Sequence, residues 1–314
     1  MRMHQRSVGA TGLKVSRLGL GTMTWGRDTD EHEARDSLIA FAEAGGTLVD
    51  TAAGYGDGAS EELIGNLIGD VVARDEIVIA TKAGISRRTG TRVTDASRGS
   101  LLTALDGSLQ RLGVDHVDLW QVHTWVDDAP LEETLSALDA AVTSGRASYV
   151  GVSNYSGWQS ARAFSLLESA RIPLVANEIE YSLVRRDPED EVAPAATALG
   201  FGLLSWSPLG RGVLSGKYRN GIPSGSRAAS PDFPGFAERF LDEHTARVTD
   251  AVTMAARGLG AKPAEVALAW VRDRPGVAAP IVGARTSAHL RSALASLELS
   301  LPAEIVAALD DVSA

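Results

Sequence analysis

Eight short apolar segments recur along the chain, each followed by residues with helical spacing, and this alternation limits the possible folds most strongly. The expected strands are too apolar to have a face in water, which favours a parallel sheet covered by helices. Eight such units close a (β/α)8 TIM barrel, and 314 residues are enough for its roughly 250 residues plus insertions. We therefore predict a single (β/α)8 barrel domain over residues 1–314, with its active site at the C-terminal ends of the strands.

The boundaries follow from hydrophobic spacing and from capping residues. The expected strands cover 17–21, 48–50, 76–82, 117–123, 149–153, 174–178, 202–206 and 279–282. The expected helices cover about 30–44, 60–68, 96–112, 131–144, 158–170, 189–199, 242–259, 263–272 and 286–296, so that an extra helix precedes the last strand. Ser60 is the expected N-cap of the second helix. The turn at 9–12 is compatible with an N-terminal hairpin.

A doubly wound sheet is the alternative fold. Against it, the first strand–helix turn, Gly19 to Trp25, lacks the third glycine of the dinucleotide-binding fingerprint. The long irregular stretch at 219–234 is rich in Gly, Ser and Pro. Loops of this length in compact domains are usually functional or disordered, so we predict a mobile loop over about 213–240 above the strand ends.

Charge and composition exclude several classes of partner. A formal net charge of −10 argues against nucleic acid or an anionic membrane as the main partner. No apolar stretch approaches the roughly 20 residues that span a bilayer. The chain has no cysteine and starts without the apolar run of a signal peptide, and we expect a cytoplasmic location. Of the six histidines, His116 and His123 lie roughly 23 Å apart along one strand, at about 3.3 Å per residue, and no metal site is predicted.

Four residues at or just beyond strand ends form a candidate catalytic site: Asp50, Tyr55, Lys82 and His123. A nearby ammonium favours the tyrosinate, so we expect Lys82 to lower the pKa of Tyr55 while Asp50 holds the ammonium in place. His123 is then placed to hydrogen-bond a substrate oxygen. This set suits protonation of an oxygen that becomes alkoxide-like when hydride reaches its carbon. Taken singly, Asp50 is equally compatible with a turn residue, Tyr55 is more typical of packing, and Lys82 and His123 are equally compatible with structural strand ends. The prediction depends on their combination.

Trp25 and Trp125 each follow a strand end. With Tyr55 and His123 they are the expected walls of the substrate pocket, although aromatic residues in such loops also serve as rim packing.

Several motifs together resemble the aldo-keto reductases. They are Asp50-Thr51-Ala52-Ala53-Gly54-Tyr55-Gly56, Ala80-Thr81-Lys82, the run from Ser108 to Leu119 with His123, Gly151 to Tyr155, Trp206 to Gly212, and Gly216-Lys217-Tyr218. They occur in the family's order over nearly the whole chain. The resemblance implies a barrel that binds NADPH without a Rossmann domain, with Tyr55 as acid/base and Lys82, Asp50 and His123 completing a tetrad.

The resemblance also implies contacts to the cofactor. Ser153 and Asn154 would bind the nicotinamide amide, and Trp206 would stack on its ring. Arg285 and Arg227 would face the 2′-phosphate. The full expected set is Gly21, Thr22, Asp50, Ser153, Asn154, Glu178, Trp206, Ser207, Pro208, Leu209, Gly210, Gly212, Lys217, Arg227, Gly283, Arg285, Ser287 and His289.

Two departures from the family pattern concern the cofactor. Glu178 stands where the family commonly has Gln beside the nicotinamide amide, which adds a negative charge there. Near the adenine, His289, Ser292 and Ala293 replace the usual Gln, Glu and Asn. The second departure concerns how tightly the adenine is held and leaves the tetrad unaffected.

Three functions remain in competition at this point. The first is an NADPH-dependent reductase of an aldehyde or ketone, in which Tyr55 is the general acid. The second is an NADP(H)-sensing regulatory subunit with little turnover, and the third is a lyase or aldolase with Lys82 as Schiff-base amine. The sequence leaves the substrate, the reaction direction, the preference for NADPH over NADH and the oligomeric state open.

Overall fold

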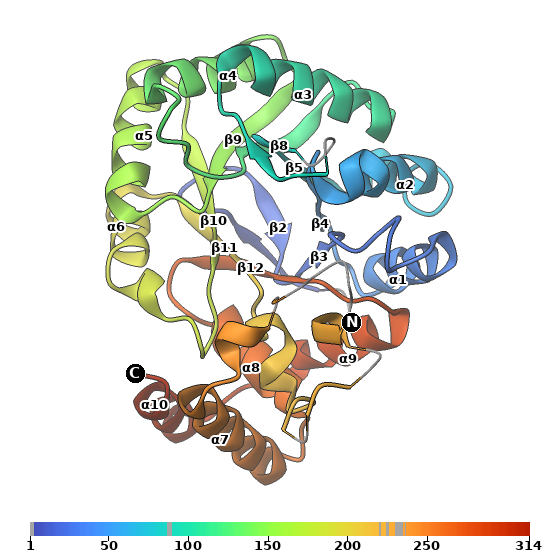
Figure 1. Cartoon of the computed structure of the whole chain (residues 1–314), viewed down its shortest axis with the longest axis vertical. Helices are drawn as coiled ribbons and strands as arrows, with labels where there is room; N and C mark the ends of the chain where they lie inside the picture. The colour runs from blue at the N-terminus through green and yellow to red at the C-terminus, as the bar shows by residue number, and fades with distance from the viewer. Residues whose placement is uncertain (1–2, 87–89, 220, 224–225, 230–234, 236) are drawn as a thin grey trace.

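The computed structural model of the chain describes residues 3–86, 90–219, 221–223, 226–229, 235 and 237–314. Eight parallel strands form a closed barrel in the order β10, β11, β12, β3, β4, β5, β8, β9 (Figure 1). Their bounds are β3 Gly19–Gly21, β4 Leu48–Asp50, β5 Val78–Ala83, β8 Val117–Val122, β9 Ala147–Ser153, β10 Leu174–Glu180, β11 Gly202–Trp206 and β12 Val277–Val282. The predicted (β/α)8 barrel is thus confirmed, and the doubly wound alternative is wrong.

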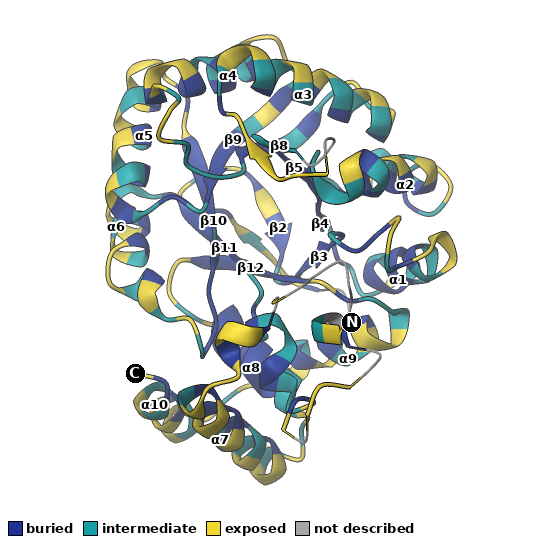
Figure 2. Ribbon diagram, viewed as in Figure 1, coloured by how far each residue is buried: buried dark blue, intermediate teal, exposed yellow. Residues whose placement is uncertain are grey.

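Helices surround the strands as an outer ring (Figure 1). They are α1 Glu31–Glu43, α2 Ala59–Leu67, α3 Arg98–Leu112, α4 Leu131–Thr143, α5 Gly157–Ser169, α6 Val192–Leu199, α7 Glu243–Leu259, α8 Pro263–Arg272, α9 Ser287–Leu294 and α10 Ala303–Val312. Both α7 and α8 lie between β11 and β12, which confirms the predicted extra helix. The barrel strands are mostly buried, whereas the helices alternate buried inner faces with exposed outer faces (Figure 2).

An antiparallel hairpin precedes the barrel, as the turn at 9–12 suggested. It pairs β1 (Gln5–Ser7) with β2 (Lys14–Ser16). Its residues Val8, Leu13 and Val15 are buried in one apolar cluster with residues of the barrel strands, including Leu48 at the start of β4. The hairpin therefore covers the end of the barrel at which the strands begin, which leaves the opposite end for a ligand.

Three details differ from the sequence prediction. The residue before α2 is Gly58, in the left-handed conformation at φ 103°, and no side chain caps this helix. Ser60 lies inside α2 instead, where its buried hydroxyl bonds to those of Thr22 and Thr51. A second small hairpin, β6 (Ile85–Ser86) with β7 (Val93–Thr94), and the C-terminal helix α10 were not predicted.

The predicted mobile loop falls partly outside the described residues. Within 213–240, residues 220, 224–225, 230–234 and 236 are not described. The described parts include the end of η4 (Gly210–Ser215), the short turn η5 (Arg227–Ala229) and η6 (Glu238–Phe240). The mobility of this segment stays a prediction.

Candidate active site

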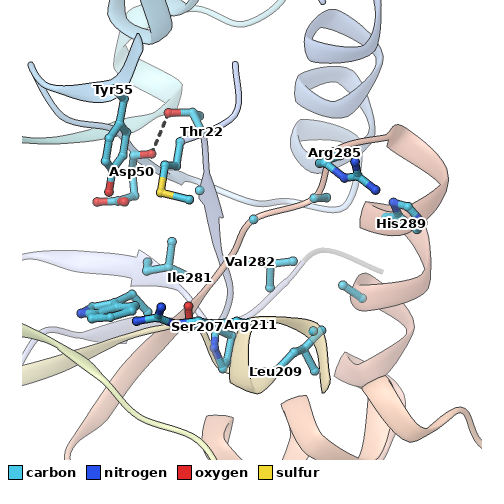
Figure 3. A pocket seen from close by; sticks show the side chains of 18 of the residues that line it. Thr22, Asp50, Tyr55, Ser207, Leu209, Arg211, Ile281, Val282, Arg285 and His289 are labelled. Carbon is cyan, nitrogen blue, oxygen red and sulfur yellow. Dashed lines mark hydrogen bonds between the residues drawn. The ribbon is translucent and has the colours of Figure 1, made fainter. Parts of the chain in front are cut away.

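A cavity of about 1030 Å³ opens where the barrel strands end. Asp50 and Tyr55 lie at one end of it and Arg285 and His289 at the other, with Ser207, Leu209 and Arg211 along one side (Figure 3). This volume lies at the upper end of the usual range for ligand pockets, which suits a large, elongated ligand. Its position is the one that (β/α)8 barrels use for their active sites.

Lys82 and Asp50 form a buried ion pair at the end of the cavity. Asp50 is the last residue of β4, and Lys82 lies on the neighbouring strand β5. The Lys82 Nζ donates to Asp50 Oδ1 at 2.5 Å and to the carbonyl oxygen of Thr51 at 3.0 Å. The two side chains are 1% and 3% exposed, so solvent screens this attraction little.

Tyr55 lies between this ion pair and His123. The Lys82 Nζ is 5.5 Å from the centre of the Tyr55 ring. The Tyr55 and His123 rings meet edge to face, with centroids 5.8 Å apart. Both Tyr55 and His123 line the cavity, whereas Lys82 lies behind them. The structure thus brings together the four residues that the sequence nominated.

Glu178 is a further partner of Lys82 that sequence reasoning did not identify in this role. Its Oε2 lies 3.1 Å from the Lys82 Nζ, and the Gln121 side-chain amide donates to the same oxygen at 3.1 Å. The expected role of Glu178 was a contact to the nicotinamide amide. Glu178 does line the cavity, but its carboxyl is engaged with the ammonium.

The pKa values of the lysine and aspartate reflect this crowding of charge. Burial lowers the pKa of Lys82, but the facing carboxyls of Asp50 and Glu178 raise it by more, and the net shift is upward. Burial and the Glu178 carboxylate raise the pKa of Asp50 well above its usual range, against the opposing effect of Lys82. Lys82 is therefore an ammonium at neutral pH.

The pKa of Tyr55 shifts in the direction opposite to our expectation. Lys82 does favour the tyrosinate, but burial opposes it more strongly, and Asp50 and Glu178 add to the opposition. The pKa of Tyr55 is consequently raised above its usual range. A phenol in this position keeps its proton until an acceptor oxygen comes within reach, which is the state that a general acid needs.

His123 is neutral in this site. Burial, followed by the charges of Lys82 and Arg92, lowers its pKa to about 3. Its Nδ1 is buried without a hydrogen-bond partner among the described residues. A neutral imidazole at the cavity wall can exchange a hydrogen bond with a ligand oxygen.

A chain of hydrogen bonds fixes the side chains along the next strand ends. The Trp206 indole N–H donates to Asn154 Oδ1 at 3.0 Å. The Asn154 amide in turn donates to the His123 carbonyl oxygen and to Ser153 Oγ, at 3.0 and 2.9 Å. Ser153, Asn154 and Trp206 all line the cavity, so this wall is pre-organised before a ligand binds.

Backbone strain concentrates around the cavity. Among the described residues, five that are not glycine have positive φ, and four of these line the cavity: Asp57, Asn154, Ser207 and Arg211. Ser207 and Arg211 belong to a loop that also contains Gly210 and Gly212 at positive φ. Such strain is typical of functional sites, and loops with left-handed residues can direct backbone N–H groups toward an anion.

Cationic side chains gather along the rest of the cavity. The sequence identified Lys217 and Arg285 there, and the structure adds Arg27, Arg92, Arg211 and Lys262. Burial and the charges of Lys217 and Arg285 lower the pKa of His289, which shows the positive potential of this end. The cavity therefore suits a ligand with several negative charges.

Most of the predicted contact residues line the cavity. They are Gly21, Thr22, Asp50, Ser153, Asn154, Glu178, Trp206, Ser207, Pro208, Leu209, Gly212, Lys217, Gly283, Arg285 and His289, together with Ser292 and Ala293. Arg211 was within reach of sequence reasoning because it lies inside the motif 206–212. Lys262 and Arg92 carry no sequence signal, since the first is the N-cap residue before α8 and the second lies beside an unpredicted hairpin.

The structure places four predicted contact residues away from the cavity lining. Trp25 is fully buried in the hydrophobic core, and Trp125 packs against Tyr155 and Trp158. Neither lines the cavity, so the expectation that they wall the substrate pocket is not met. Gly210 faces Val184, and the Ser287 N–H donates to Glu33. The side chain of Arg227 is outside the described part of the structure, and its predicted role stays a prediction.

The described residues offer neither a metal cluster nor a membrane-spanning helix. No group of three His, Cys, Asp or Glu side chains in that part of the chain is placed to hold a metal ion. In the same residues, no helix is both long and apolar enough to span a bilayer.

The barrel and the cavity at its strand ends define the class of this protein as a (β/α)8 barrel with a ligand cavity at the position where such barrels have their active sites. Residues 17–314 match the model of the Aldo/keto reductase family, and the chain therefore belongs to that family of oxidoreductases. Members of the family generally use NAD(P)H.

Three relatives illustrate the range of the family. The uncharacterized oxidoreductase YrpG of Bacillus subtilis (strain 168) is 37% identical, over 99% of this chain and 96% of its own. A probable voltage-gated potassium channel subunit beta of Oryza sativa subsp. japonica is 35% identical, over 90% of this chain and 87% of its own. The L-glyceraldehyde 3-phosphate reductase of Escherichia coli O157:H7 is 33% identical, over 98% of this chain and 92% of its own.

Proposed function

We propose that this enzyme reduces the carbonyl group of a small aldehyde or ketone to an alcohol, with NADPH as reductant and Tyr55 as general acid. The observation that carries the proposal is the position of the Tyr55 phenol. It lines the cavity between a buried ammonium and a neutral imidazole, within a site that keeps the phenol protonated.

The residues along the cavity fit NADPH chemically. Ser153 and Asn154 offer hydrogen bonds to a carboxamide, and the Trp206 ring offers a face for stacking. The strained loop around Ser207 suits a pyrophosphate, and Arg285 with Lys262 suits a further phosphate. When bound, NADPH supplies the hydride for the carbonyl carbon.

Each residue of the tetrad then has a task in moving the proton. Tyr55 gives its proton to the carbonyl oxygen as negative charge develops there. The Lys82 ammonium, held by Asp50, stabilises the resulting phenolate. His123 hydrogen-bonds the same oxygen as a neutral imidazole and so helps to orient the carbonyl.

Tyr55→Phe is the direct test of the acid. We expect turnover to fall by about a hundredfold to ten-thousandfold, the usual contribution of general acid–base catalysis. NADPH binding, measured by the change in its fluorescence, should stay close to wild type because the phenol is not a phosphate contact. Loss of both properties, or of neither, would contradict this role of Tyr55.

An NADP(H)-sensing regulatory subunit is the second candidate. The similarity to a probable potassium channel subunit beta favours it, because that relative also covers most of the chain. NADPH consumption with a panel of aldehydes and ketones separates the two candidates. The panel should include phosphorylated aldehydes, as the name of another relative suggests. Tight NADPH binding without consumption across the panel would favour sensing.

We do not propose Schiff-base chemistry at Lys82. The amine is 1% exposed, carries its proton at neutral pH and is held by two carboxyls. A lyase of this kind needs a neutral amine that a carbonyl carbon can reach.

A further inference from the structure

Two carboxyls face one ammonium in the interior of the barrel. Asp50 reaches Lys82 from the neighbouring strand β4, at 2.5 Å. Glu178 reaches it across the barrel from β10, at 3.1 Å. The side chains of Asp50 and Glu178 are each 3% exposed, and that of Lys82 is 1% exposed. Because both carboxyls touch the same nitrogen, they are close neighbours of each other.

The charges of this cluster do not balance if both carboxyls are ionised. Two carboxylates and one ammonium leave one buried negative charge, which is costly in a poorly solvated place. Two carboxyls beside one another avoid this cost by sharing a proton, as in other carboxyl pairs. The strong upward shift in the pKa of Asp50, which Glu178 helps to cause through charge and a hydrogen bond between the carboxyls, agrees with this.

Among the residues that the structure describes, the other groups that face the pair supply no compensating positive charge. Gln121 on β8 is uncharged and donates to Glu178. His123, just beyond β8, is neutral because its pKa is lowered to about 3. Tyr55 in η1 (Tyr55–Gly58) is neutral because its pKa is raised. Lys82 remains as the ammonium that both carboxyls share.

We propose that Asp50 and Glu178 form a carboxyl pair that holds one proton at neutral pH, and that Glu178 is thereby a positioning residue for Lys82. The effect of Glu178 on Tyr55 rests on the proposed function, whereas the protonated pair itself does not. When the pair loses its proton at higher pH, the cluster gains a negative charge that opposes ionisation of Tyr55. The site thus contains an ionisation that an enzyme with a neutral amide at position 178 lacks.

Infrared spectroscopy of the whole protein tests the pair directly. At neutral pH we expect the C=O stretching band of a protonated carboxylic acid, and its loss in both Glu178→Gln and Asp50→Asn. In each variant only one carboxyl faces Lys82, so the pair that shares the proton no longer exists. If one of the two variants fails to fold, the other still tests the carboxyl pair. Glu61→Gln is the matched control, because Glu61 is equally buried but has its own guanidinium partner, Arg111, at 2.8 Å.

The proposal is wrong if the wild-type spectrum lacks a protonated-acid band. It is also wrong if that band persists in a folded Glu178→Gln or Asp50→Asn variant. It is equally overturned if Glu61→Gln removes the same band. The infrared band does not depend on catalytic turnover. A protein that shows the band but never consumes NADPH would therefore refute the proposed function without refuting the carboxyl pair.

The pH profile of kcat tests the link to Tyr55. In wild type we expect one ionisation that Glu178→Gln loses, with the KM for NADPH little changed. If instead Glu178→Gln raises the KM for NADPH several-fold and leaves the pH profile unchanged, Glu178 is a cofactor contact and its positioning role is wrong.

Discussion

In the folded protein, His123 is neutral at the mildly acidic pH values at which a histidine in water carries a proton. Its pKa falls from an ordinary value near 6.5 to about 3, because burial excludes the charged imidazole and Lys82 and Arg92 repel it. Between about pH 6.5 and about pH 3, the unfolded chain therefore binds a proton at His123 and the folded chain does not. His123 costs no stability above about pH 6.5, and its cost grows as the pH falls from there toward about 3.

The prediction concerns the variant His123→Asn, which removes this penalty. Relative to wild type, its free energy of unfolding should improve by about 1.4 kcal/mol for each pH unit between about pH 6 and about pH 4. Urea denaturation at a series of pH values measures the difference. His32→Asn is the control, because the His32 side chain is 82% exposed. A difference between His123→Asn and wild type that does not vary with pH would show that His123 is not held neutral.

Residue identity predicted the tetrad, but it did not predict the balance of charges within it. The order and spacing of Asp50, Tyr55, Lys82 and His123 are visible in the sequence. The net upward shift of the Tyr55 pKa comes mainly from burial, and Asp50 and Glu178 add to it. The extent of burial cannot be read before the strands and loops are placed, so the expectation of a lowered pKa was wrong.

At the scale of elements, the small hairpin of β6 and β7 brings a charge to the tetrad end of the cavity. Arg92 adjoins β7, lines the cavity and lies close enough to His123 to lower the pKa of that imidazole. A guanidinium beside the carbonyl site favours substrates whose remote end carries a carboxylate or a phosphate.

Arg92→Met should therefore reduce kcat/KM by up to about fivefold for an anionic carbonyl substrate, the upper end of what one solvent-exposed ion contact contributes, and little for a neutral one. Steady-state kinetics with a matched pair of substrates measures this. Arg98→Met is the control, because the Arg98 guanidinium donates to the Ser136 carbonyl oxygen on α4 and does not line the cavity. Equal losses for both substrates would refute a role in charge selection.

The elements that sequence predicted well are those whose own residues determine them. The eight strands are short apolar runs, and long helices such as α3 and α7 have strong helical spacing, so their existence was visible. The start of α2 was wrong because Ser60 resembles an N-cap locally, yet its hydroxyl is satisfied by Thr22 and Thr51 inside the barrel.

The C-terminal helix α10 depends on partners that are distant in the sequence. Its Asp310 accepts from the Trp270 indole at 2.8 Å and from the Arg274 guanidinium at 3.0 Å. Asp310 and the buried Leu309 have these neighbours only after the barrel has formed. The segment nevertheless has helical spacing of its own, with Ile305, Leu309 and Val312 following Pro302, so α10 was within reach of the sequence and the prediction missed it.

At the scale of the whole molecule, residues from the first and the last strand–helix units of the barrel line the same cavity. β12 pairs with β3 to close the barrel, through Ile281 with Gly19 and Val282 with Leu20. The cavity lining runs from Gly21 in the first unit to Ala293 in the last, across this seam. A ligand that fills the cavity contacts both sides of the closure, and its binding energy should add to the stability of the whole barrel.

NADPH at a hundred times its Kd should therefore raise the free energy of unfolding by about 2.7 kcal/mol. For a chain of 314 residues this corresponds to a rise in Tm of about 4 °C, measured by scanning calorimetry. NADH at the same concentration should give a smaller rise, because it lacks the phosphate that suits the cationic end of the cavity.

Arg285→Gln should bring the NADPH shift down toward the NADH shift, since Arg285 lines that end. Arg291→Gln is the control, because Arg291 lies on α9 nearby but is exposed and does not line the cavity. Equal shifts with NADPH and NADH in wild type would contradict the proposed preference for NADPH, whereas a shift that Arg285→Gln leaves intact would place the phosphate against other residues.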